Sequence, residues 1–298
     1  MAFLYHILND TEREIAEAKR GKSGLNMGDL KRKIRDTPPV RSFADSLSKG
    51  FGLIAEIKRK SPSAGEMRRE NFDNAPEAYD KSPVVRALSV LTNYTHFGMR
   101  IEEMLDIKSR VRQPILRKDF ILKEYQIYQS RAFGADAVLL MANVLSGEKM
   151  RRFYELAQEL GLDALFEAHT EEEIASLPAG ATVCGINSRN FMASNRWLLA
   201  KVFTRMGLGR SGHGPDPSVD LQTFSLIKYL PRNAIKVAES GVKPGKIDTI
   251  MDLGYDAVLV GTSLLKAPEG IHEILAEFEA AVRQRTNHNA PLVAAATA

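Results

Sequence analysis

A glutamate and a lysine two residues apart, Glu56 and Lys58, interrupt an otherwise apolar stretch of the sequence, LIAEIKR at 53–59. Residues two apart on an extended strand point to the same face, so the carboxylate and the ammonium group lie side by side. Groups of these types can accept and donate protons in general acid–base catalysis. A buried structural ion pair is the alternative interpretation, and other stretches of the sequence help to distinguish the two.

Other apolar, strand-like stretches also end in polar or charged residues. These residues are Lys118, Glu167, His169, Asn187, Arg189, Glu239 and Ser240. Each of them alone would be an ordinary loop residue or one half of a structural ion pair. Together they favour a polar cup of three carboxylates and three cations, because burying so many charges without a use costs on the order of several kcal/mol per ion.

Two glycine-containing pairs suggest a ligand for this cup. Ser240-Gly241 and Gly261-Thr262 follow the last two strand-like stretches of the chain. Glycine lets the backbone approach a ligand closely, and backbone N–H groups at such places commonly bind phosphate. The two pairs together predict a phosphate-binding site.

The elements that must position these residues alternate in type along the chain. Strand-like stretches are separated by amphipathic, helix-like ones, which indicates parallel strands joined by right-handed crossovers. Eight such strands predict a closed (β/α)8 TIM barrel, in which the carboxyl ends of all strands meet at one rim and build the site. The eight stretches are 52–59, 85–92, 113–120, 135–142, 163–169, 181–189, 233–240 and 255–262.

Regions outside this repeat complete the predicted organisation. Residues 1–50 form an N-terminal helical extension packed on the barrel, with helices expected at 4–20, 28–35 and 42–50. The barrel spans 51–285, and residues 286–298 form a flexible tail.

The composition sets limits on function. The chain has 298 residues, 44% of them hydrophobic, and a net charge of +4, which suits an anionic small molecule but is too diffuse to indicate nucleic acid. No apolar stretch approaches the length of a membrane span, and the N-terminus has no pattern of a secretory signal. The single cysteine, Cys184, excludes an internal disulfide, so we expect a cytoplasmic protein.

Long sequence motifs resemble one family closely from about residue 4 to residue 280. The motifs are IAEIKRKSPSAG, ALSVLT, PILRKDFILKEYQI, GADAVLLM, GINSRNF, KVAESGV and AVLVGTSLL. They resemble indole-3-glycerol phosphate synthase of tryptophan biosynthesis, a (β/α)8 barrel that needs no metal or organic cofactor. The resemblance implies a carboxy-lyase that closes the indole ring of 1-(2-carboxyphenylamino)-1-deoxyribulose 5-phosphate and releases carbon dioxide and water.

The resemblance also implies roles for individual residues. Lys118 matches the general acid on the substrate carbonyl, and Glu167 matches the glutamate that assists proton removal during dehydration. Lys58 matches a lysine near the substrate anions with a proposed acid role. The other catalytic and substrate-binding residues carried over are Glu56, Asn187, Glu239, Ser240, Arg189, Phe120, Phe97, Ser61, Gly241, Gly261 and Thr262.

The second strand's loop, TNYTHFGMR, departs from the family pattern. Asn93 occupies the position of an acidic residue in the family, and Met99 occupies that of a serine. The loop is one residue shorter than in the family pattern. Phe97 is the expected aromatic residue of this loop. These changes affect how the loop meets the substrate more than they affect the chemistry.

A larger departure follows the sixth strand, where residues 192–217 form an insertion. Ser194 or Asn195 could cap a helix that runs to Met206 and carries Trp197 among its apolar positions. Our hypothesis is a lid or a partner-binding helix near the rim, and the alternative is an exposed decoration. The GLGRSG sequence within it follows no strand, so it does not predict a dinucleotide site.

Two other functions compete with the leading one. Phosphoribosylanthranilate isomerase, a sister barrel of the same pathway, would use a cysteine and an aspartate, against which the lysine and glutamate set argues. The second is a diverged paralogue that acts as a binding or regulatory partner with weak activity. The altered loop and the insertion favour it, and the intact acid–base set argues against it.

Overall fold

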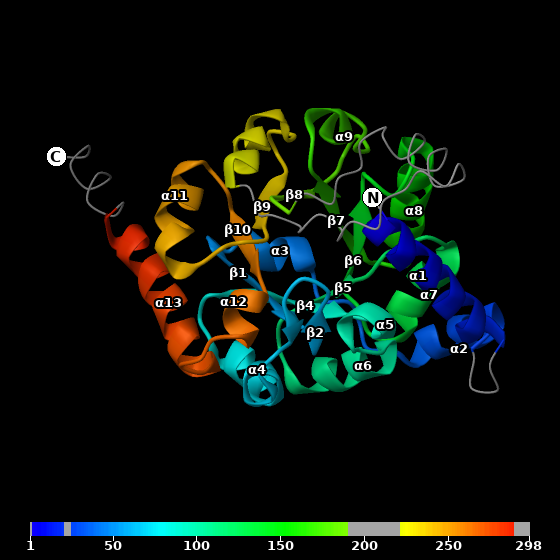
Figure 1. The fold of residues 1–298 in the computed structure, drawn as a ribbon. Coiled ribbons are helices and arrows are strands. Elements are labelled where there is room, and N and C mark those ends of the chain that lie inside the picture. The colour runs from blue at the N-terminus through cyan, green and yellow to red at the C-terminus, as the bar shows by residue number, and fades with distance from the viewer. Residues whose placement is uncertain (1, 21–24, 190–220, 289–298) are drawn as a thin grey trace, which may run out of the picture.

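Eight parallel strands close into a barrel in the computed structural model, which describes residues 2–20, 25–189 and 221–288. Figure 1 shows the strands as a central ring, in the order β1-β10-β9-β8-β7-β6-β5-β4. The prediction of a (β/α)8 TIM barrel is therefore confirmed. The strands are β1 (Gly52–Ile57), β4 (Val85–Leu91), β5 (Ile115–Lys118), β6 (Ala137–Met141), β7 (Asp163–Ala168), β8 (Val183–Asn187), β9 (Ile235–Glu239) and β10 (Ala257–Val260).

Helices surround the ring and bury the outer face of the strands, which explains why the strand sequences are apolar almost throughout. The long outer helices are α4 (Arg69–Lys81), α6 (Ile101–Arg110), α7 (Glu124–Ala132), α8 (Gly147–Glu159) and α13 (Ile271–His288). Shorter elements are α5 (Tyr94–Phe97), α9 (Glu171–Ala175), η1 (Leu221–Tyr229), η2 (Pro244–Lys246), α11 (Ile247–Asp252), α12 (Thr262–Leu265) and the hairpin β2 (Lys60–Ser61)–β3 (Gly65–Glu66).

Two of the predicted segments fall partly or wholly outside the described residues. Helix α13 continues to His288, so the first residues of the predicted tail are helical, and the rest of that tail is not described. The predicted insertion, residues 192–217, lies entirely outside the described residues.

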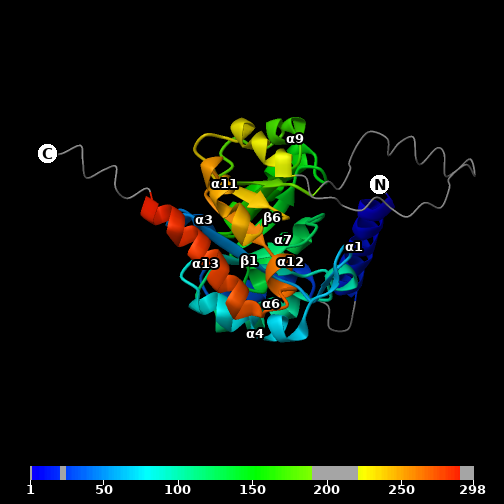
Figure 2. The same ribbon diagram turned by 60° about the vertical axis from the view of Figure 1, so that its left-hand side comes forward.

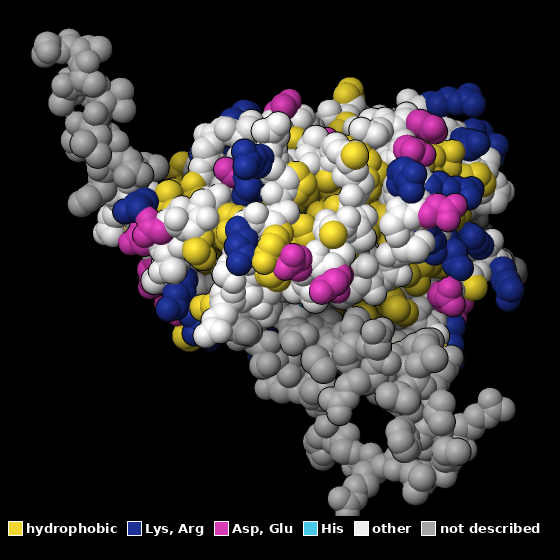
Figure 3. Space-filling view, turned by 90° about the horizontal axis from the view of Figure 1, so that it is seen from above, with side chains coloured by type: hydrophobic (Ala, Val, Ile, Leu, Met, Phe, Trp, Pro, Cys, Tyr) yellow, Lys and Arg dark blue, Asp and Glu magenta, His cyan; other side chains and the backbone are white. Residues whose placement is uncertain are grey.

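The outer surface of the barrel carries charges of both signs. Figure 3 looks onto the side formed by α9, η1 and α11, where basic and acidic side chains are intermixed with apolar and uncharged ones. None of the helices in the described part of the chain combines the length and apolar composition that crossing a bilayer requires.

The N-terminal segment places helices at both ends of the barrel, as Figures 1 and 2 show. Its helices are α1 (Ala2–Arg20), α2 (Met27–Asp36) and α3 (Phe43–Leu47), the last shorter than the expected 42–50. At the amino end of the strands, the backbone N–H groups of Phe43 and Ala44 donate to Asp163, at 2.8 and 3.0 Å. At the other end, Asn93 donates to Thr11 of α1 at 3.0 Å.

A buried ion pair holds the amino end of the barrel together. Lys108 of α6 donates to both carboxylate oxygens of Asp136, and the two side chains are 5% and 0% exposed. Asp136 also accepts from the backbone N–H groups of Arg41 and Ile115, each at 2.7 Å. One carboxylate therefore joins the N-terminal segment, a helix and two strands.

We expect Asp136→Asn to lower the free energy of unfolding by about 3–5 kcal/mol, because the ammonium group of Lys108 would stay buried without a counter-ion. Urea unfolding measures the change. The control is Lys81→Ala, which breaks an exposed pair with Glu77 and should leave the unfolding midpoint nearly unchanged. Equal stability of Asp136→Asn and the native chain would contradict the assignment.

Candidate active site

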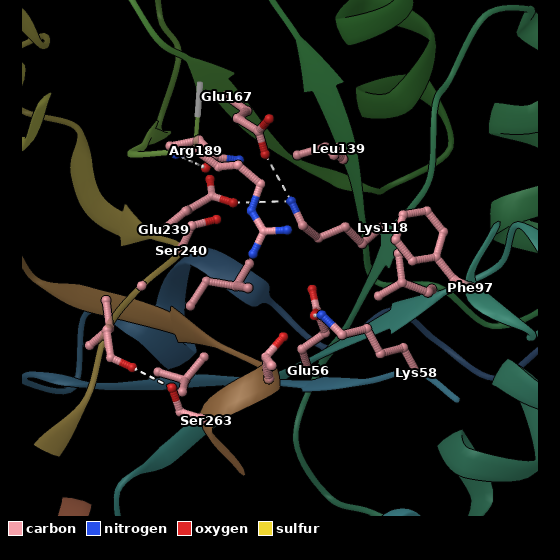
Figure 4. A pocket seen from close by; sticks show the side chains of 18 of the residues that line it. Glu56, Lys58, Phe97, Lys118, Leu139, Glu167, Arg189, Glu239, Ser240 and Ser263 are labelled. Carbon is pink, nitrogen blue, oxygen red and sulfur yellow. Dashed lines mark hydrogen bonds and ion pairs between the residues drawn. The ribbon is translucent and has the colours of Figure 1, made fainter. Parts of the chain in front are cut away.

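A cavity of about 300 Å³ opens at the carboxyl ends of the strands. All the predicted site residues line it except Ser61. Figure 4 shows their side chains converging on this space from separate strands and loops. The lining residues predicted from the sequence are Glu56, Lys58, Phe97, Lys118, Phe120, Glu167, Asn187, Arg189, Glu239, Ser240, Gly241, Gly261 and Thr262.

Four of these residues form one layer of the barrel interior: Glu56, Lys118, Glu167 and Glu239. They come from β1, β5, β7 and β9, the first, third, fifth and seventh strands of the ring. Alternate strands of such a barrel contribute the four side chains of each interior layer, and those layers are usually filled by Val, Ile and Leu. Here the layer nearest the mouth consists of three carboxyl groups and one ammonium group.

Lys118 is the centre of this polar layer. Its Nζ atom donates to Glu167 Oε2 at 2.8 Å and to Glu239 Oε2 at 3.1 Å, as the dashed lines in Figure 4 show. The Lys118 side chain is 14% exposed, and each glutamate side chain is 1% exposed. Because water is nearly excluded, these contacts control the charge of every member.

The protonation states follow from this arrangement. Burial alone would lower the pKa of Lys118, but Glu167, Glu239 and Glu56 outweigh it and raise the pKa. Burial raises the pKa of Glu239 to about 8, with Lys118 opposing the shift and the charge of Glu167 adding to it. Burial would also raise the pKa of Glu167, but Lys118 and His169 overcome it and the pKa is lowered. At neutral pH Lys118 is thus an ammonium group, Glu167 a carboxylate and Glu239 a carboxylic acid.

Glu56, the fourth member of the layer, forms a separate ion pair with Lys58. Lys58 Nζ donates to Glu56 Oε1, and both side chains are under a tenth exposed. Burial would raise the pKa of Glu56, but Lys58 and then Lys118 lower it, so the carboxylate stays ionised. The pair faces the cavity, which favours a functional site over a closed structural ion pair.

Glycines on or directly after the neighbouring strands make room for the carboxyl groups. A Cβ atom on Gly185 of β8 would lie 2.0 Å from Glu239 Oε1. One on Gly261 would lie 2.2 Å from Glu56 Oε1. No side chain other than hydrogen fits at these two positions while the glutamates keep their places.

The loops after β9 and β10 form one wall of the cavity. The hydroxyl of Ser263, in α12 directly after β10, donates to the backbone oxygen of Val242 at 2.8 Å and ties this helix to the loop after β9. Ser240 has a φ of +70°, the only positive value among the described residues other than glycine, and Gly241 follows at +69°. This left-handed turn is costly for a serine, and such strain clusters at ligand sites.

Aromatic residues and a guanidinium also line the cavity, and in Figure 4 Phe97 lies across the cavity from Arg189, which is on the Glu239 side. Phe97 of α5 and the buried Phe120 line the cavity. Asn93 caps α5 by accepting from the His96 backbone N–H at 3.0 Å. Arg189 donates to the hydroxyl of Ser63 at 2.6 Å, and Ser63 lies in the turn between β2 and β3.

Asp119 lines the cavity too and was missed as a site residue. It accepts from Arg117 at 2.8 Å and from the hydroxyl of Thr92 at 2.7 Å, and all three are buried. Arg117 and Asp119 flank Lys118 in the chain, and their ion pair fixes the end of β5. The acidic residue directly after two basic residues in the sequence RKD was the available signal.

The cavity lining lacks three residues named in the sequence analysis: Ser61, His169 and Cys184. Ser61 is buried, and its hydroxyl accepts from the backbone N–H of Ala64 at 3.1 Å. Cys184, which the isomerase alternative would need, is fully buried in β8, and burial raises the pKa of its thiol to about 12. A thiol in this state is a poor proton donor or acceptor at neutral pH.

A sequence model of one family, indole-3-glycerol phosphate synthase, matches residues 4–195 of the chain. The match ends within the segment 192–217 that we interpret as an insertion. The chain is 40% identical over 230 residues to the indole-3-glycerol phosphate synthase of Thermoanaerobacter pseudethanolicus, which covers 76% of this chain and 78% of that one. It is 35% identical over 276 residues to the one of Chlorobium phaeovibrioides, with 90% and 96% covered.

Solved structures support the fold at much lower identity. The 3-hexulose-6-phosphate synthase of Salmonella typhimurium superposes with a TM-score of 0.54 at 15% identity over 79% of this chain and 99% of that one. Thiamine phosphate pyrophosphorylase of Pyrococcus furiosus gives 0.53 at 16% identity over 82% and 98%. The sequence matches are far stronger, and on them the chain belongs to the indole-3-glycerol phosphate synthase family.

Proposed function

We propose that the protein performs the reaction of its family, the conversion of 1-(2-carboxyphenylamino)-1-deoxyribulose 5-phosphate to indole-3-glycerol phosphate, carbon dioxide and water. The observation that carries this proposal is the ammonium group of Lys118 held between Glu167 and Glu239 in a nearly dry layer. This arrangement supplies one acid and one base within reach of the same substrate atoms.

The shape and charge of the cavity suit a doubly anionic substrate. The loops that carry Gly241 and Gly261 lie where barrels of this type bind phosphate, and Lys243 lines the cavity beside them. Lys58 and Arg189 supply positive charge nearer the carboxyl layer, where the substrate carboxylate would lie. Phe97 and Phe120 provide apolar surface for the aromatic ring.

Ring closure needs an acid at the carbonyl oxygen. The aromatic carbon that bears the carboxylate attacks the carbonyl carbon, and negative charge develops on the oxygen. Lys118 keeps its proton in the free protein because three glutamates raise its pKa. Its ammonium group then stabilises the oxyanion and transfers a proton to it. Loss of carbon dioxide returns the electron pair to the ring and restores its aromaticity.

Dehydration needs an acid and a base together. The new hydroxyl leaves as water after it is protonated, and the neighbouring methylene carbon loses a proton. Glu167, ionised through its contact with Lys118, is the proposed base. Glu239 holds a proton up to about pH 8, so it can resupply the acid that protonates the leaving hydroxyl.

The competing functions have less support. The isomerase would need an acid–base cysteine, and Cys184 is buried in β8 away from the cavity. A purely regulatory paralogue would not need the buried charges, which are costly to maintain without a use. A protein partner that binds the 192–217 segment remains a separate hypothesis, since that segment lies outside the described residues.

We expect Lys118→Ala to lower kcat by several orders of magnitude and Glu167→Gln by about 10²–10⁴, the range for general acid–base groups. Indole fluorescence with the carboxyphenylamino-deoxyribulose phosphate measures both. The control is Lys123→Ala, which removes a half-exposed lysine at the start of α7 that pairs with Glu12 outside the cavity. Turnover of Lys118→Ala equal to the native rate would refute the role of the lysine.

The dependence of kcat on pH should show the ionisation of Glu239. Ionisation above about pH 8 removes its proton and makes Lys118 a weaker acid, so kcat should fall on the alkaline side. Glu239→Gln is neutral at every pH and should flatten this limb between about pH 7.5 and 9. An unchanged alkaline limb in Glu239→Gln would assign the titration to another group.

Stability offers an independent check on Glu239. Its folded-state pKa is raised, so its contribution is fully present below the unfolded pKa and is lost as pH rises through about 8. The native chain should therefore lose more stability than Glu239→Gln between pH 6 and 9, as thermal unfolding would report.

A further inference from the structure

The proposed reaction consumes a proton, because the substrate enters with an ionised carboxylate and leaves it as neutral carbon dioxide. One proton goes to the carbonyl oxygen and a second goes to the hydroxyl that leaves as water. The methylene carbon returns only one. The polar layer is therefore one proton short after each turnover, and solvent must resupply it.

A chain of side chains runs from the polar layer toward solvent. His169 Nε2 lies 3.6 Å from Glu167 Oε1, and His169 Nδ1 lies 3.1 Å from Glu173 Oε2. The exposed fraction of the side chains rises along this path, from 1% at Glu167 to 9% at His169 and 16% at Glu173. The path leaves the barrel through α9, away from the cavity that substrate would fill.

The geometry of Glu173 suits a fixed role. Its Oε2 atom also accepts from the backbone N–H of His169 at 2.7 Å, so the carboxylate is held from two directions. Its own backbone N–H donates to the hydroxyl of Thr170 at 3.2 Å, which caps α9. The imidazole between Glu167 and Glu173 is therefore oriented by its own loop.

The charges around His169 favour its protonated form. Glu167 from β7, Glu173 from α9 and Glu239 from β9 all face it, and Lys118 from β5 is held beyond Glu167. Burial alone would lower the pKa of His169, but its hydrogen bond to Glu173 and the charges of Glu167 and Glu173 outweigh it and raise the pKa. The surroundings of His169 therefore stabilise the imidazolium form relative to a histidine in water.

We propose that His169 and Glu173 form a proton entry path that recharges Glu167, and through it Lys118, from solvent during turnover. The inference rests on the proposed function, since it follows from that reaction's proton balance. The relay starts from the neutral ring with its proton on Nε2. Glu173 takes a proton from water and passes it to Nδ1, and the imidazolium so formed releases its Nε2 proton to Glu167 Oε1 across a contact that must shorten from 3.6 Å. Exchange of the remaining proton from Nδ1 to Nε2 through solvent resets the ring. His169 does not touch the substrate in this scheme and is a positioning and relay residue.

The first test compares His169→Ala with His169→Phe. We expect both to lower kcat by roughly tenfold to a hundredfold with KM changed by less than about twofold, because proton transfer and not binding is impaired. Added imidazole should restore the rate of His169→Ala in proportion to its concentration, since the vacated space can hold it. It should not rescue His169→Phe, in which the ring fills that space.

The second test uses the surface end of the path. Glu173→Gln keeps an oxygen acceptor for the His169 backbone but cannot deliver a proton, so kcat should fall and the solvent deuterium isotope effect on kcat should rise. Glu171→Gln is the matched control, because it removes an equivalent charge from the first turn of α9. Equal rates and isotope effects in the two variants would overturn the proposal, as would unchanged kcat in both His169 variants.

A measurement independent of activity separates this inference from the proposed function. Nitrogen-15 NMR of His169 should show a ring that stays protonated above the ordinary histidine range and titrates at lower pH in Glu173→Gln. An inactive native protein with this titration would refute the proposed reaction. An active native protein in which Glu173→Gln leaves the titration unchanged would refute the relay alone.

Discussion

The structure depends on one constraint, that three carboxyl groups occupy an interior layer of a barrel, where aliphatic side chains are usual. Carboxylates so deeply buried need a cation, and Lys118 reaches Glu167 and Glu239 from a third strand. They also repel one another, which Glu239 relieves by keeping its proton. The same burial that makes the layer expensive gives its members separate protonation states, and these states are what acid–base chemistry requires.

Much of the surrounding structure holds this layer in position. Arg117 and Asp119 lock the backbone on both sides of Lys118, and their partner Thr92 belongs to the segment after β4. Helix α1 contacts the loop that carries Phe97 through the Asn93–Thr11 hydrogen bond. At the far end of the barrel, Asp136 and Asp163 tie the N-terminal segment to the strands. The stability of the barrel and the geometry of its cavity thus rely on separate polar contacts.

The ring of strands could be predicted from the sequence, because each strand is an apolar stretch between amphipathic helices. The convergence of Glu56, Lys118 and Glu239 at one rim could be predicted too, since each lies at the carboxyl end of such a stretch. It could not give the sign of the Lys118 pKa shift, since burial and three carboxylates act in opposite directions and only distances decide between them. Ser61 shows another limit, because its hydroxyl accepts from the backbone N–H of Ala64 and does not line the cavity. The importance of Gly185 was also hidden, since a lone glycine in a strand does not reveal what lies opposite.

The close approach of Gly185 to Glu239 has a consequence for how this sequence can change over evolutionary time. A methyl group at position 185 would occupy the place of the carboxyl oxygen, so the cost of that substitution depends on the residue at position 239. The two sites, far apart in the chain, are epistatic: an alanine at 185 becomes acceptable only after the glutamate has been lost. Gly261 and Glu56 form a second such pair. If this interior evolved toward the usual aliphatic side chains, the glutamates would therefore have to be replaced first and the glycines only afterward.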